Sequence, residues 1–333
     1  MTDAFKVVLI ANDDHPIPDW VSGTFADAGV DYSYHQCYDQ EDLQRWAANA
    51  DVLWLQSARE DLVVEEYMDI FKRAGAVIKC GSGTDNIDHE ACTKRGIIVA
   101  HTPEDVTDPT SDHHIALLFS AVRQTVRQDR LVRQGKWDPA AVSPLGPLAG
   151  ADLGLVGFGR IGRAVVRKLS GFEMVVRVYD PYVDETAIEA AGADKVDLAG
   201  LLESSQYVLL ACPLTAETRQ LIGEEELRMM RSDAVLVNVA RAGVVDEQAL
   251  IMALREQWIS AAALDVVEEH PLGLRDEFRN LENCIVTPHM GGARHDYPDA
   301  IFSTVVEVII EMSRKHMPKW IVNRDVIPKW DLV

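Results

Sequence analysis

Short apolar runs alternate with helical segments along most of this chain, and no other feature constrains its fold as strongly. One series of runs lies in the first third of the chain, at 7–11, 51–56, 76–80 and 97–101. A second series lies at 153–157, 175–179, 207–212, 234–240, 261–267 and 284–289. Runs separated by helices in this way are typical of βαβ units, whose strands form a parallel sheet. We therefore expect an α/β fold with two doubly wound parallel sheets.

Two apolar patterns outside these series predict helices. From Thr110 to about Gly135, apolar residues recur at a three-to-four-residue spacing that predicts one long amphipathic helix. A second apolar stretch, roughly 299–315, predicts a helix near the end of the chain. With 333 residues, the chain is long enough for about two domains, each with its own core.

Composition limits the classes of partner. The chain has 32 Lys and Arg against 53 Asp and Glu, and the resulting net charge of −21 repels phosphate backbones and anionic membrane surfaces. No stretch reaches the roughly twenty apolar residues of a membrane span. We therefore expect no nucleic-acid or membrane partner. Anionic ligands must be held by local groups, such as helix N-termini and single arginines.

The cysteines and the N-terminus indicate a cellular compartment. Five cysteines are an odd number without a CxxC pair, which argues against a disulfide framework and against a zinc site. The apolar run near the N-terminus is too short for the core of a signal peptide. We expect a cytoplasmic protein without a metal site. The cysteines are Cys37, Cys80, Cys92, Cys212 and Cys284.

A glycine-rich turn joins the run at 153–157 to the helical segment that follows it. The sequence GFGRIG at 157–162 is a complete GxGxxG between a predicted strand and a predicted helix. The first glycine permits a tight turn, the second lets a pyrophosphate approach the backbone, and the third allows the helix to pack closely on the strand. The turn predicts dinucleotide binding. The structural alternative is a tight turn without a nucleotide.

An acidic residue follows this turn at the spacing expected for a ribose contact. Asp180 ends the next predicted strand, 18 positions after Gly162, where a carboxylate accepts hydrogen bonds from ribose hydroxyls and repels a 2′-phosphate. Arg177 is a counter-signal, but strand alternation places it on the face of Tyr179 and opposite Val178. We therefore expect NAD (NADH) as the cofactor, with NADP disfavoured.

Polar residues follow several strands of the second series, at the strand ends where ligands bind in open α/β sheets. In NVARAG, Arg241 comes directly after an apolar run, and a guanidinium there can bind a carboxylate or polarise a carbonyl. In TPHMGG, His289 precedes two glycines and can exchange a proton near neutral pH. The alternatives are structural: an arginine that bridges surface acids, and a histidine that only packs.

Together these motifs resemble the D-2-hydroxyacid dehydrogenase family, which includes phosphoglycerate dehydrogenases and glyoxylate/hydroxypyruvate reductases. The order is GxGxxG with its acid, then NVAR, then LDV–EEHP, then TPH, and the resemblance covers nearly the whole chain. It extends to residues 79–97, which look like the family's substrate-carboxylate loop. Residues 101–118 look like the family's entry into its interdomain helix.

The resemblance implies two Rossmann-like domains with a cleft between them. The implied activity is the NAD(H)-dependent interconversion of a small anionic 2-oxo acid and its D-2-hydroxy acid. An NAD-binding domain of residues 102–292 would be inserted into a flavodoxin-like substrate-binding domain made of 1–101 and 293–333. The family also implies a homodimer formed through the NAD-binding domain.

The family's functional residues map onto individual positions of this chain. Arg241 matches the catalytic arginine that orients the 2-oxo acid, and His289 matches the acid/base that protonates the carbonyl oxygen. Backbone N–H groups around Ser82 and Gly83 match the contact to the substrate carboxylate. The residues that match cofactor contacts are Gly157, Gly159, Arg160, Ile161, Gly162, Asp180, Cys212, Pro213, Val239, Ala240, Asp265 and Thr110.

One catalytic position departs from the family pattern. The family has a glutamate before the proline of its DVxxxEP segment, where this chain has His270 followed by Pro271. A carboxylate there favours the imidazolium form of the catalytic histidine, and a second imidazole does not. Three interpretations stay open: Glu269 takes the partner's role, His270 itself is a neutral partner or ligand contact, or the protein binds a dinucleotide without efficient turnover.

Other features leave further alternatives open. Arg59, Arg294 and His295 favour a substrate with a second acidic group, or they are surface residues of an acidic protein. The departure at His270 also fits dehydrogenation of a different anion, such as phosphite or formate. A third alternative is an NAD(H)-responsive binding protein like the family's corepressor branch, whose pattern is similar to residues 111–118.

Overall fold

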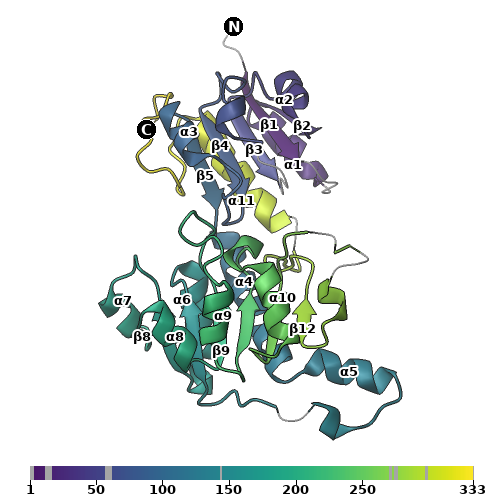
Figure 1. Cartoon of the computed structure of the whole chain (residues 1–333). Helices are drawn as coiled ribbons and strands as arrows, with labels where there is room; N and C mark the ends of the chain where they lie inside the picture. The colour runs from purple at the N-terminus through teal and green to yellow at the C-terminus, as the bar shows by residue number, and fades with distance from the viewer. Residues whose placement is uncertain are drawn as a thin grey trace. The chain divides into compact units, whose positions relative to one another are not determined.

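Two units, each built around its own parallel sheet, make up the chain (Figure 1). The computed structural model describes residues 4–11, 17–56, 62–142, 145–269, 272–273, 277–296 and 299–332. Unit 1 is formed by Met1–Val106 and Arg294–Val333, and unit 2 is formed by Thr107–Ala293. The predicted α/β fold with two parallel sheets is confirmed.

Unit 1 is built on a five-stranded sheet of order β2-β1-β3-β4-β5, in which every strand pair is parallel. The strands are β1 (Phe5–Ala11), β2 (Val30–Gln36), β3 (Val52–Gln56), β4 (Ala76–Cys80) and β5 (Ile98–Thr102). The helices are α1 (Asp19–Asp27), α2 (Gln40–Trp46), η1 (Glu65–Tyr67), α3 (His89–Lys94) and α11 (Asp299–Ser313). Side chains of α2 and α3 are buried against one face, and those of α1 and α11 against the other. The central strand β3 is therefore buried along its whole length.

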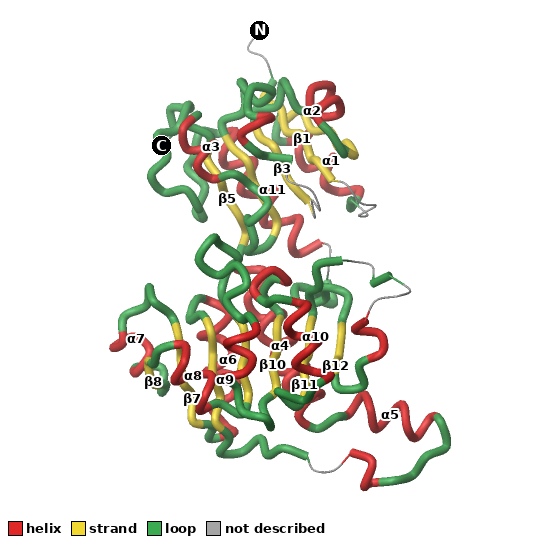
Figure 2. The backbone as a smooth tube through the Cα atoms, in the orientation of Figure 1, coloured by secondary structure: helices red, strands yellow, loops and turns green. Residues whose placement is uncertain are grey.

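Unit 2 is built on a seven-stranded parallel sheet of order β12-β11-β10-β9-β6-β7-β8 (Figure 2). The strands are β6 (Asp152–Val156), β7 (Val175–Tyr179), β8 (Asp194–Lys195), β9 (Tyr207–Leu210), β10 (Val235–Asn238), β11 (Ala261–Leu264) and β12 (Cys284–Val286). The α-helices are α4 (Glu104–Val122), α5 (Thr125–Arg133), α6 (Arg160–Leu169), α7 (Glu185–Glu189), α8 (Leu198–Ser204), α9 (Glu224–Met229) and α10 (Glu247–Arg255). The 3-10 helices are η2 (Pro139–Val142), η3 (Ser170–Phe172), η4 (Ala242–Val244) and η5 (Glu277–Asn280).

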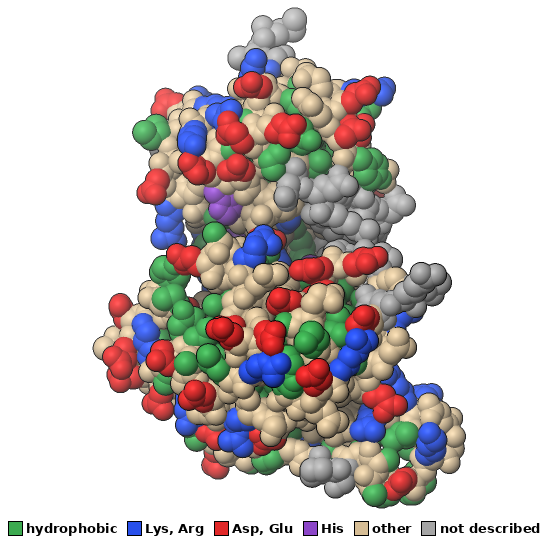
Figure 3. All heavy atoms as spheres, in the orientation of Figure 1, with side chains coloured by type: hydrophobic (Ala, Val, Ile, Leu, Met, Phe, Trp, Pro, Cys, Tyr) green, Lys and Arg blue, Asp and Glu red, His purple; other side chains and the backbone are tan. Residues whose placement is uncertain are grey.

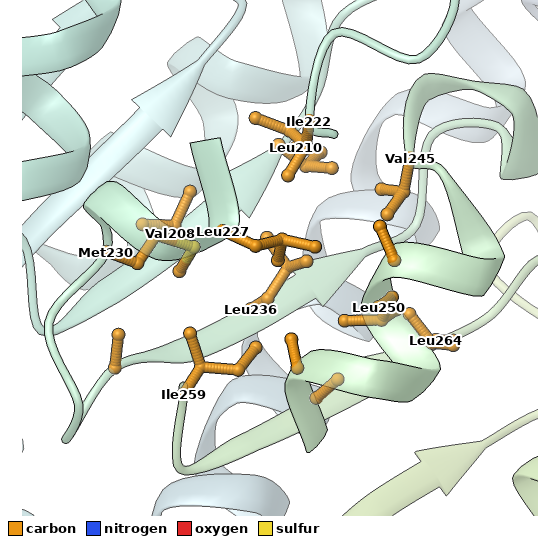
Figure 4. Close-up of a cluster of buried hydrophobic side chains, with 14 of the residues drawn as sticks. Val208, Leu210, Ile222, Leu227, Met230, Leu236, Val245, Leu250, Ile259 and Leu264 are labelled. Atoms are coloured by element: carbon orange, nitrogen blue, oxygen red, sulfur yellow. The ribbon is translucent and has the colours of Figure 1, made fainter. Parts of the chain in front are cut away.

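The two faces of the unit 2 sheet carry separate apolar layers. Helices α8, α9 and α10 bury Leu202, Leu227 and Leu250 against one face, part of which is shown in Figure 4. Helices α4 and α6 bury Leu118 and Val165 against the other. Full burial of each such side chain contributes about 1.5–3 kcal/mol. Because helices pack on both faces of the sheet, the strand ends are held in place, and the loops that follow them start from fixed positions.

The strand order of unit 2 reverses between β6 and β9. After β6 the chain continues to β7 and β8 on one side, and it then returns to β9 and proceeds outward to β12 on the other. In open α/β sheets, ligands bind beyond the carboxyl ends of the strands at such a reversal. The segments that follow β6 and β9 therefore lie where a ligand is expected.

The single helix predicted from Thr110 to about Gly135 is wrong in its bounds. Two helices, α4 and α5, occupy this segment. Gln124 lies between them with a φ of 49°, a left-handed conformation that interrupts the regular helical hydrogen bonds. Helix α4 also begins earlier than predicted and contains Pro109, which gives up one helical hydrogen bond because it has no N–H.

The surface mixes both signs of charge. Figure 3 shows acidic and basic side chains interspersed over the visible face. None of the helices in the described ranges is both long and apolar enough to cross a bilayer. All five cysteines are free thiols, and four of them are buried.

Candidate active site

The glycine-rich turn follows β6 and leads directly into α6. Gly157 has a φ of 96°, in the left-handed region that favours glycine, and its N–H donates to the Tyr179 carbonyl at 2.9 Å. Gly159 is the N-cap of α6, which begins at Arg160. Among the described residues, none accepts a hydrogen bond from the backbone N–H of Gly159 or Ile161. These donors and the positive end of the helix dipole are suited to bind a phosphate anion.

Two of the three glycines have a steric reason, and the third borders open space. A Cβ on Gly157 would lie 2.7 Å from the backbone nitrogen of Cys212, because the turn packs against the segment after β9. A Cβ on Gly162 would overlap the Gly157 carbonyl oxygen, so glycine lets α6 pack closely on the turn. A Cβ on Gly159 would meet no atom within 4 Å, which leaves open space beside the unbonded N–H groups. The residues of this turn therefore fit the pyrophosphate of a dinucleotide.

Replacing Gly159 and Gly162 one at a time is expected to separate the effect on folding stability from the effect on NADH binding. Gly162→Ala is expected to lower the free energy of unfolding by about 1–3 kcal/mol, the usual cost of overpacking, and to weaken NADH binding. Gly159→Ala is expected to unfold like the wild type, because its Cβ enters open space, and yet to weaken NADH binding. Thermal unfolding and NADH fluorescence titration measure the two effects.

Gly171→Ala is the matched control for these variants. A Cβ on Gly171 also meets no atom within 4 Å, and this residue lies in η3, beyond the C-terminal end of α6. The control is expected to change neither stability nor binding. Wild-type NADH affinity in Gly159→Ala would contradict a cofactor position over this turn.

Asp180 lies just beyond β7, and both of its carboxylate oxygens accept backbone hydrogen bonds. Oδ2 accepts from the Phe158 N–H at 2.7 Å, and Oδ1 accepts from the Tyr182 N–H at 2.9 Å. The Tyr182 hydroxyl in turn donates to the Glu217 carboxylate, and this bond raises the pKa of Tyr182. Asp180 is thereby fixed beside the glycine-rich turn, and Tyr182 connects it to a second carboxylate.

Arg177, the counter-signal to an NAD preference, is paired elsewhere. Its Nη1 lies 2.7 Å from Asp152 Oδ1. Asp152 is the first residue of β6, whereas the glycine-rich turn follows the last residue of that strand. The guanidinium is therefore engaged toward the amino end of the sheet, away from the carboxyl end where Asp180 lies.

Arg241 lies in a short turn after β10, and the buried side-chain amide of Asn238 holds this turn in place. Asn238, the last residue of β10, is 1% exposed. Its Oδ1 accepts from the Ala240 N–H at 3.0 Å, and its Nδ2 donates to the Arg241 carbonyl at 2.9 Å. Arg241 Nη1 donates to the Ala240 carbonyl at 2.8 Å. These bonds fix the backbone of Arg241 and the direction of its half-buried side chain.

Asp265, directly after β11, is a buried carboxylate that accepts four hydrogen bonds. Its exposed fraction is 1%. Oδ1 accepts from the Thr287 hydroxyl at 2.5 Å and the Met290 N–H at 2.8 Å. His113 Nε2 lies 3.1 Å from the same oxygen, and the Gly291 N–H donates to Oδ2 at 2.7 Å. A buried charge is costly unless hydrogen-bond donors surround it. Three of the four donors to Asp265 come from the segment after β12. Asp265 therefore holds that segment in place.

His289 lies in the turn that Asp265 holds. Its φ of 56° is a left-handed conformation, which costs roughly 1–3 kcal/mol for a residue other than glycine. The His289 N–H donates to the Asp265 carbonyl at 2.9 Å, and the residue is exposed. A Cβ on Gly291 would lie 2.8 Å from Val239 Cγ1 and 2.9 Å from Asp265 Oδ2, so the turn also requires glycine there.

One backbone bond connects the two residues that hold these turns. The Asp265 N–H donates to the Asn238 carbonyl at 2.9 Å, so the buried residues at the ends of β10 and β11 are directly bonded. Asn238 fixes the turn of Arg241, and Asp265 fixes the turn of His289. The structure thus places a guanidinium and an exposed imidazole on turns that follow β10 and β12, the two strands that flank β11.

The other residues predicted to contact a cofactor follow neighbouring strands or lie on α4. Cys212 and Pro213 follow β9, and Val239 follows β10. Thr110 is buried in α4, and its carbonyl lies 2.9 Å from His114 Nδ1. Burial raises the pKa of the Cys212 thiol to about 11. This cysteine is therefore a neutral packing group near neutral pH and not a nucleophile.

The predicted carboxylate loop of unit 1 follows β4. Gly81 has a φ of 80°, and its N–H donates to Thr102 Oγ1 at 3.1 Å. The Ser82 carbonyl lies 3.0 Å from His101 Nδ1. No residue within the described ranges accepts a hydrogen bond from the N–H of Ser82 or Gly83. The loop therefore presents two backbone donors suited to an anion.

Four further residues singled out in the sequence are not placed in the site by the described structure. His270 and Arg59 lie outside the described residues. Arg294 pairs with Asp296 through two nitrogen–oxygen contacts of 2.8 Å. The His295 side chain is 93% exposed. This geometry favours the interpretation of Arg294 and His295 as surface residues.

Two residues of the buried network were not identified from the sequence. Asn238 has one local sign, because it is a polar residue that closes an otherwise apolar run. His113 has no such sign in its local sequence, because its partner Asp265 lies 152 positions away. Only the fold brings α4 against the segments that follow β11 and β12.

Comparison with known proteins relates most of the chain to one family. Residues 115–291 match the family model described as D-isomer specific 2-hydroxyacid dehydrogenase, NAD binding domain. A glyoxylate reductase of Pyrococcus furiosus is 40% identical over 283 residues, which cover 83% of this chain and 84% of the relative. The crystal structure of a glyoxylate reductase from Paecilomyes thermophila has a TM-score of 0.85 at 25% identity and covers 95% of this chain and 98% of that one. An NADPH-dependent glyoxylate/hydroxypyruvate reductase from Sinorhizobium meliloti, in complex with NADP and malonate, has a TM-score of 0.84 at 25% identity and covers 99% of this chain and 100% of that one.

Proposed function

The chain belongs to the D-isomer specific 2-hydroxyacid dehydrogenase family, and we propose that it reduces a small 2-oxo acid to the D-2-hydroxy acid with NADH. Membership makes it an oxidoreductase with an NAD-binding domain. The observation that carries the proposal is the bond between Asp265 and Asn238, because it links the turn of His289 to the turn of Arg241. A cation and a proton donor at the same edge of the sheet as a dinucleotide turn are the groups that reduction of an anionic carbonyl compound requires.

Arg241 and His289 act on different parts of the substrate. The Arg241 guanidinium pairs with the 2-oxo acid and orients its carbonyl group. The Ser82 and Gly83 N–H groups of unit 1, which have no acceptor among the described residues, keep their predicted role as donors to a carboxylate. Bound NADH supplies the hydride that reaches the carbonyl carbon. His289 donates a proton to the carbonyl oxygen, so the product is the neutral hydroxyl and no alkoxide charge remains.

Glyoxylate is the first substrate to test. The Pyrococcus furiosus relative is named a glyoxylate reductase, and it covers most of this chain. We expect glyoxylate or a 2-oxo acid of similar size to support NADH oxidation, followed by absorbance with the purified protein. The product is analysed on a chiral column wherever it has a stereocentre.

The residues around Asp180 favour NADH over NADPH. A 2′-phosphate placed beside Asp180 would meet its carboxylate and that of Glu217, which Tyr182 connects to it. The cation of Arg177 is paired with Asp152 toward the amino end of the sheet, away from Asp180. We expect kcat/KM with NADH to exceed that with NADPH by at least about tenfold, since like-charge contacts cost several kcal/mol. Asp180→Asn is expected to narrow this ratio, and equal kcat/KM for the two cofactors in the wild type would contradict the assignment.

His270 keeps its role as a prediction from the sequence, because it lies outside the described residues. A carboxylate beside an imidazole favours the imidazolium form. His270→Glu is therefore expected to move the pH optimum of 2-oxo acid reduction upward, because reduction consumes a proton held on His289. The pH profiles of kcat/KM for wild type and variant measure this shift. An unchanged pH profile would mean that the side chain at position 270 does not act on His289, and it would favour Glu269 as the partner of His289.

We also propose that the chain forms a homodimer through unit 2. Helix α5 has no buried residue, and Figure 1 shows it set apart from the sheet. The exposed fractions of Val132 and Trp137 are 50% and 85%. Val132 lies on α5 and Trp137 lies in the loop that follows it, and exposed large apolar side chains of this kind are typical of a protein contact. Light scattering of the purified chain distinguishes the dimer from a monomer.

A further inference from the structure

Asp265 receives one of its hydrogen bonds from a helix that is distant in the sequence. His113 lies on α4, 152 positions from Asp265, and its Nε2 lies 3.1 Å from Asp265 Oδ1. The same nitrogen lies 3.0 Å from the Thr287 hydroxyl oxygen. The exposed fractions of the His113 and Asp265 side chains are 20% and 1%, so the contact is largely shielded from water. A hydrogen bond in such surroundings is stronger than one at the surface.

The chemistry of the partners assigns a hydrogen to Nε2 of His113. An ionised carboxylate only accepts hydrogen bonds. The Thr287 hydroxyl donates to Asp265 Oδ1 at 2.5 Å, so its oxygen is left to accept. The N–H of His113 is therefore shared between Asp265 and Thr287. It connects α4 to the segments that follow β11 and β12.

The same carboxylate holds the turn that carries His289. Asp265 accepts from the N–H groups of Met290 and Gly291 at 2.8 and 2.7 Å. The left-handed conformation of His289 persists only while its surroundings enforce it. Removing one donor from a buried carboxylate favours its displacement or the entry of water. Misplacing a catalytic group by about 1 Å can lower a rate by about 10²-fold.

We propose that His113 is a positioning residue that acts on His289 through Asp265 and Thr287. Its N–H keeps the Asp265 carboxylate in place, and the carboxylate keeps the turn of His289 in place. This inference rests on the proposed function, since it takes His289 as the proton donor. It extends the catalytic machinery to α4, which contributes no group to the reaction itself.

Two amide variants separate the hydrogen bond from the polarity of the side chain. In His113→Gln, an amide nitrogen lies about as far from Cβ as Nε2 does in histidine, whereas the shorter amide of His113→Asn cannot reach Asp265. His113→Asn is expected to lower kcat about tenfold to hundredfold, the loss expected for one hydrogen bond to a charged group. His113→Gln is expected to retain most of kcat.

Asp112→Asn is the matched control on the same helix. Asp112 is exposed and pairs with Lys168 at 2.7 Å, with no contact to Asp265 among the bonds of the described residues. This control is expected to leave kcat and NADH binding unchanged.

Hydrogen exchange of the Met290 and Gly291 amides is a second readout that does not depend on activity. Both amides donate to Asp265, so they are expected to exchange faster in His113→Asn than in the wild type or His113→Gln. Equal kcat and equal exchange in the two variants would overturn the positioning role, as would a loss confined to the KM for NADH. If the wild type turns over no 2-oxo acid, the proposed function fails, and amide exchange still decides the role of His113.

Discussion

His289→Gln is expected to lower kcat for 2-oxo acid reduction by about 10²–10⁴-fold, the usual contribution of a positioned general acid. Glutamine keeps the polarity and approximate size of histidine, but it does not carry an exchangeable proton near neutral pH. The variant is expected to bind NADH like the wild type, because the glycine-rich turn at 157–162 follows a different strand. Steady-state kinetics and NADH titration measure the two quantities.

His316→Gln is the control for the loss of one imidazole. His316 follows α11 and pairs with Glu311 on the surface, so this variant is expected to keep wild-type kcat. A His289→Gln protein with wild-type kcat would mean that another group supplies the proton. The assignment of His289 would then be wrong.

Arg241→Ala is expected to lower kcat/KM by about 10²–10³-fold, the loss seen when one donor to the developing charge is removed. The backbone bonds of Asn238 to this turn do not depend on the Arg241 side chain, so the fold is expected to survive the change. Arg241→Lys is expected to recover only part of the loss, because lysine lacks the planar fork that binds a carboxylate through two hydrogen bonds. Kinetics with one 2-oxo acid at saturating NADH measure both variants.

Arg255→Ala is the control for the loss of one guanidinium. Arg255 ends α10 and pairs with Glu277 at 2.8 Å, and its side chain is 51% exposed. A surface pair of this kind contributes about 0–1 kcal/mol to stability, so activity and folding are expected to stay near wild type. Full turnover by Arg241→Ala would refute its role in orienting the substrate.

The two sheets could be predicted because their strands are encoded locally. Strands such as β6 and β10 are buried on both faces and are therefore apolar at nearly every position. The division between α4 and α5 could not be predicted. It depends on the left-handed backbone of Gln124, and glutamine is a residue that ordinarily favours a helix. The early start of α4 could not be predicted because proline usually stands in the first turn of a helix, whereas Pro109 lies inside α4.

The candidate site could also be predicted only in part. The glycine-rich turn could be predicted because its three glycines lie within one short strand–turn–helix segment. Arg241 and His289 could be nominated because each follows an apolar run. The bonds that hold them depend on Asn238, Asp265 and His113, which only the register of β10 with β11 and the packing of α4 bring together. No pattern within a short window of sequence contains that information.

The most direct test of the proposed function is NADH oxidation by the wild-type protein across pH. The substrates are glyoxylate, hydroxypyruvate, pyruvate and 2-oxoglutarate, and phosphite and formate are tested in parallel for reduction of NAD. We predict turnover of at least one small 2-oxo acid, with NADH preferred to NADPH. Absence of turnover on every 2-oxo acid, in a protein that still binds NADH, would contradict the proposal, and NAD reduction by phosphite or formate would replace it.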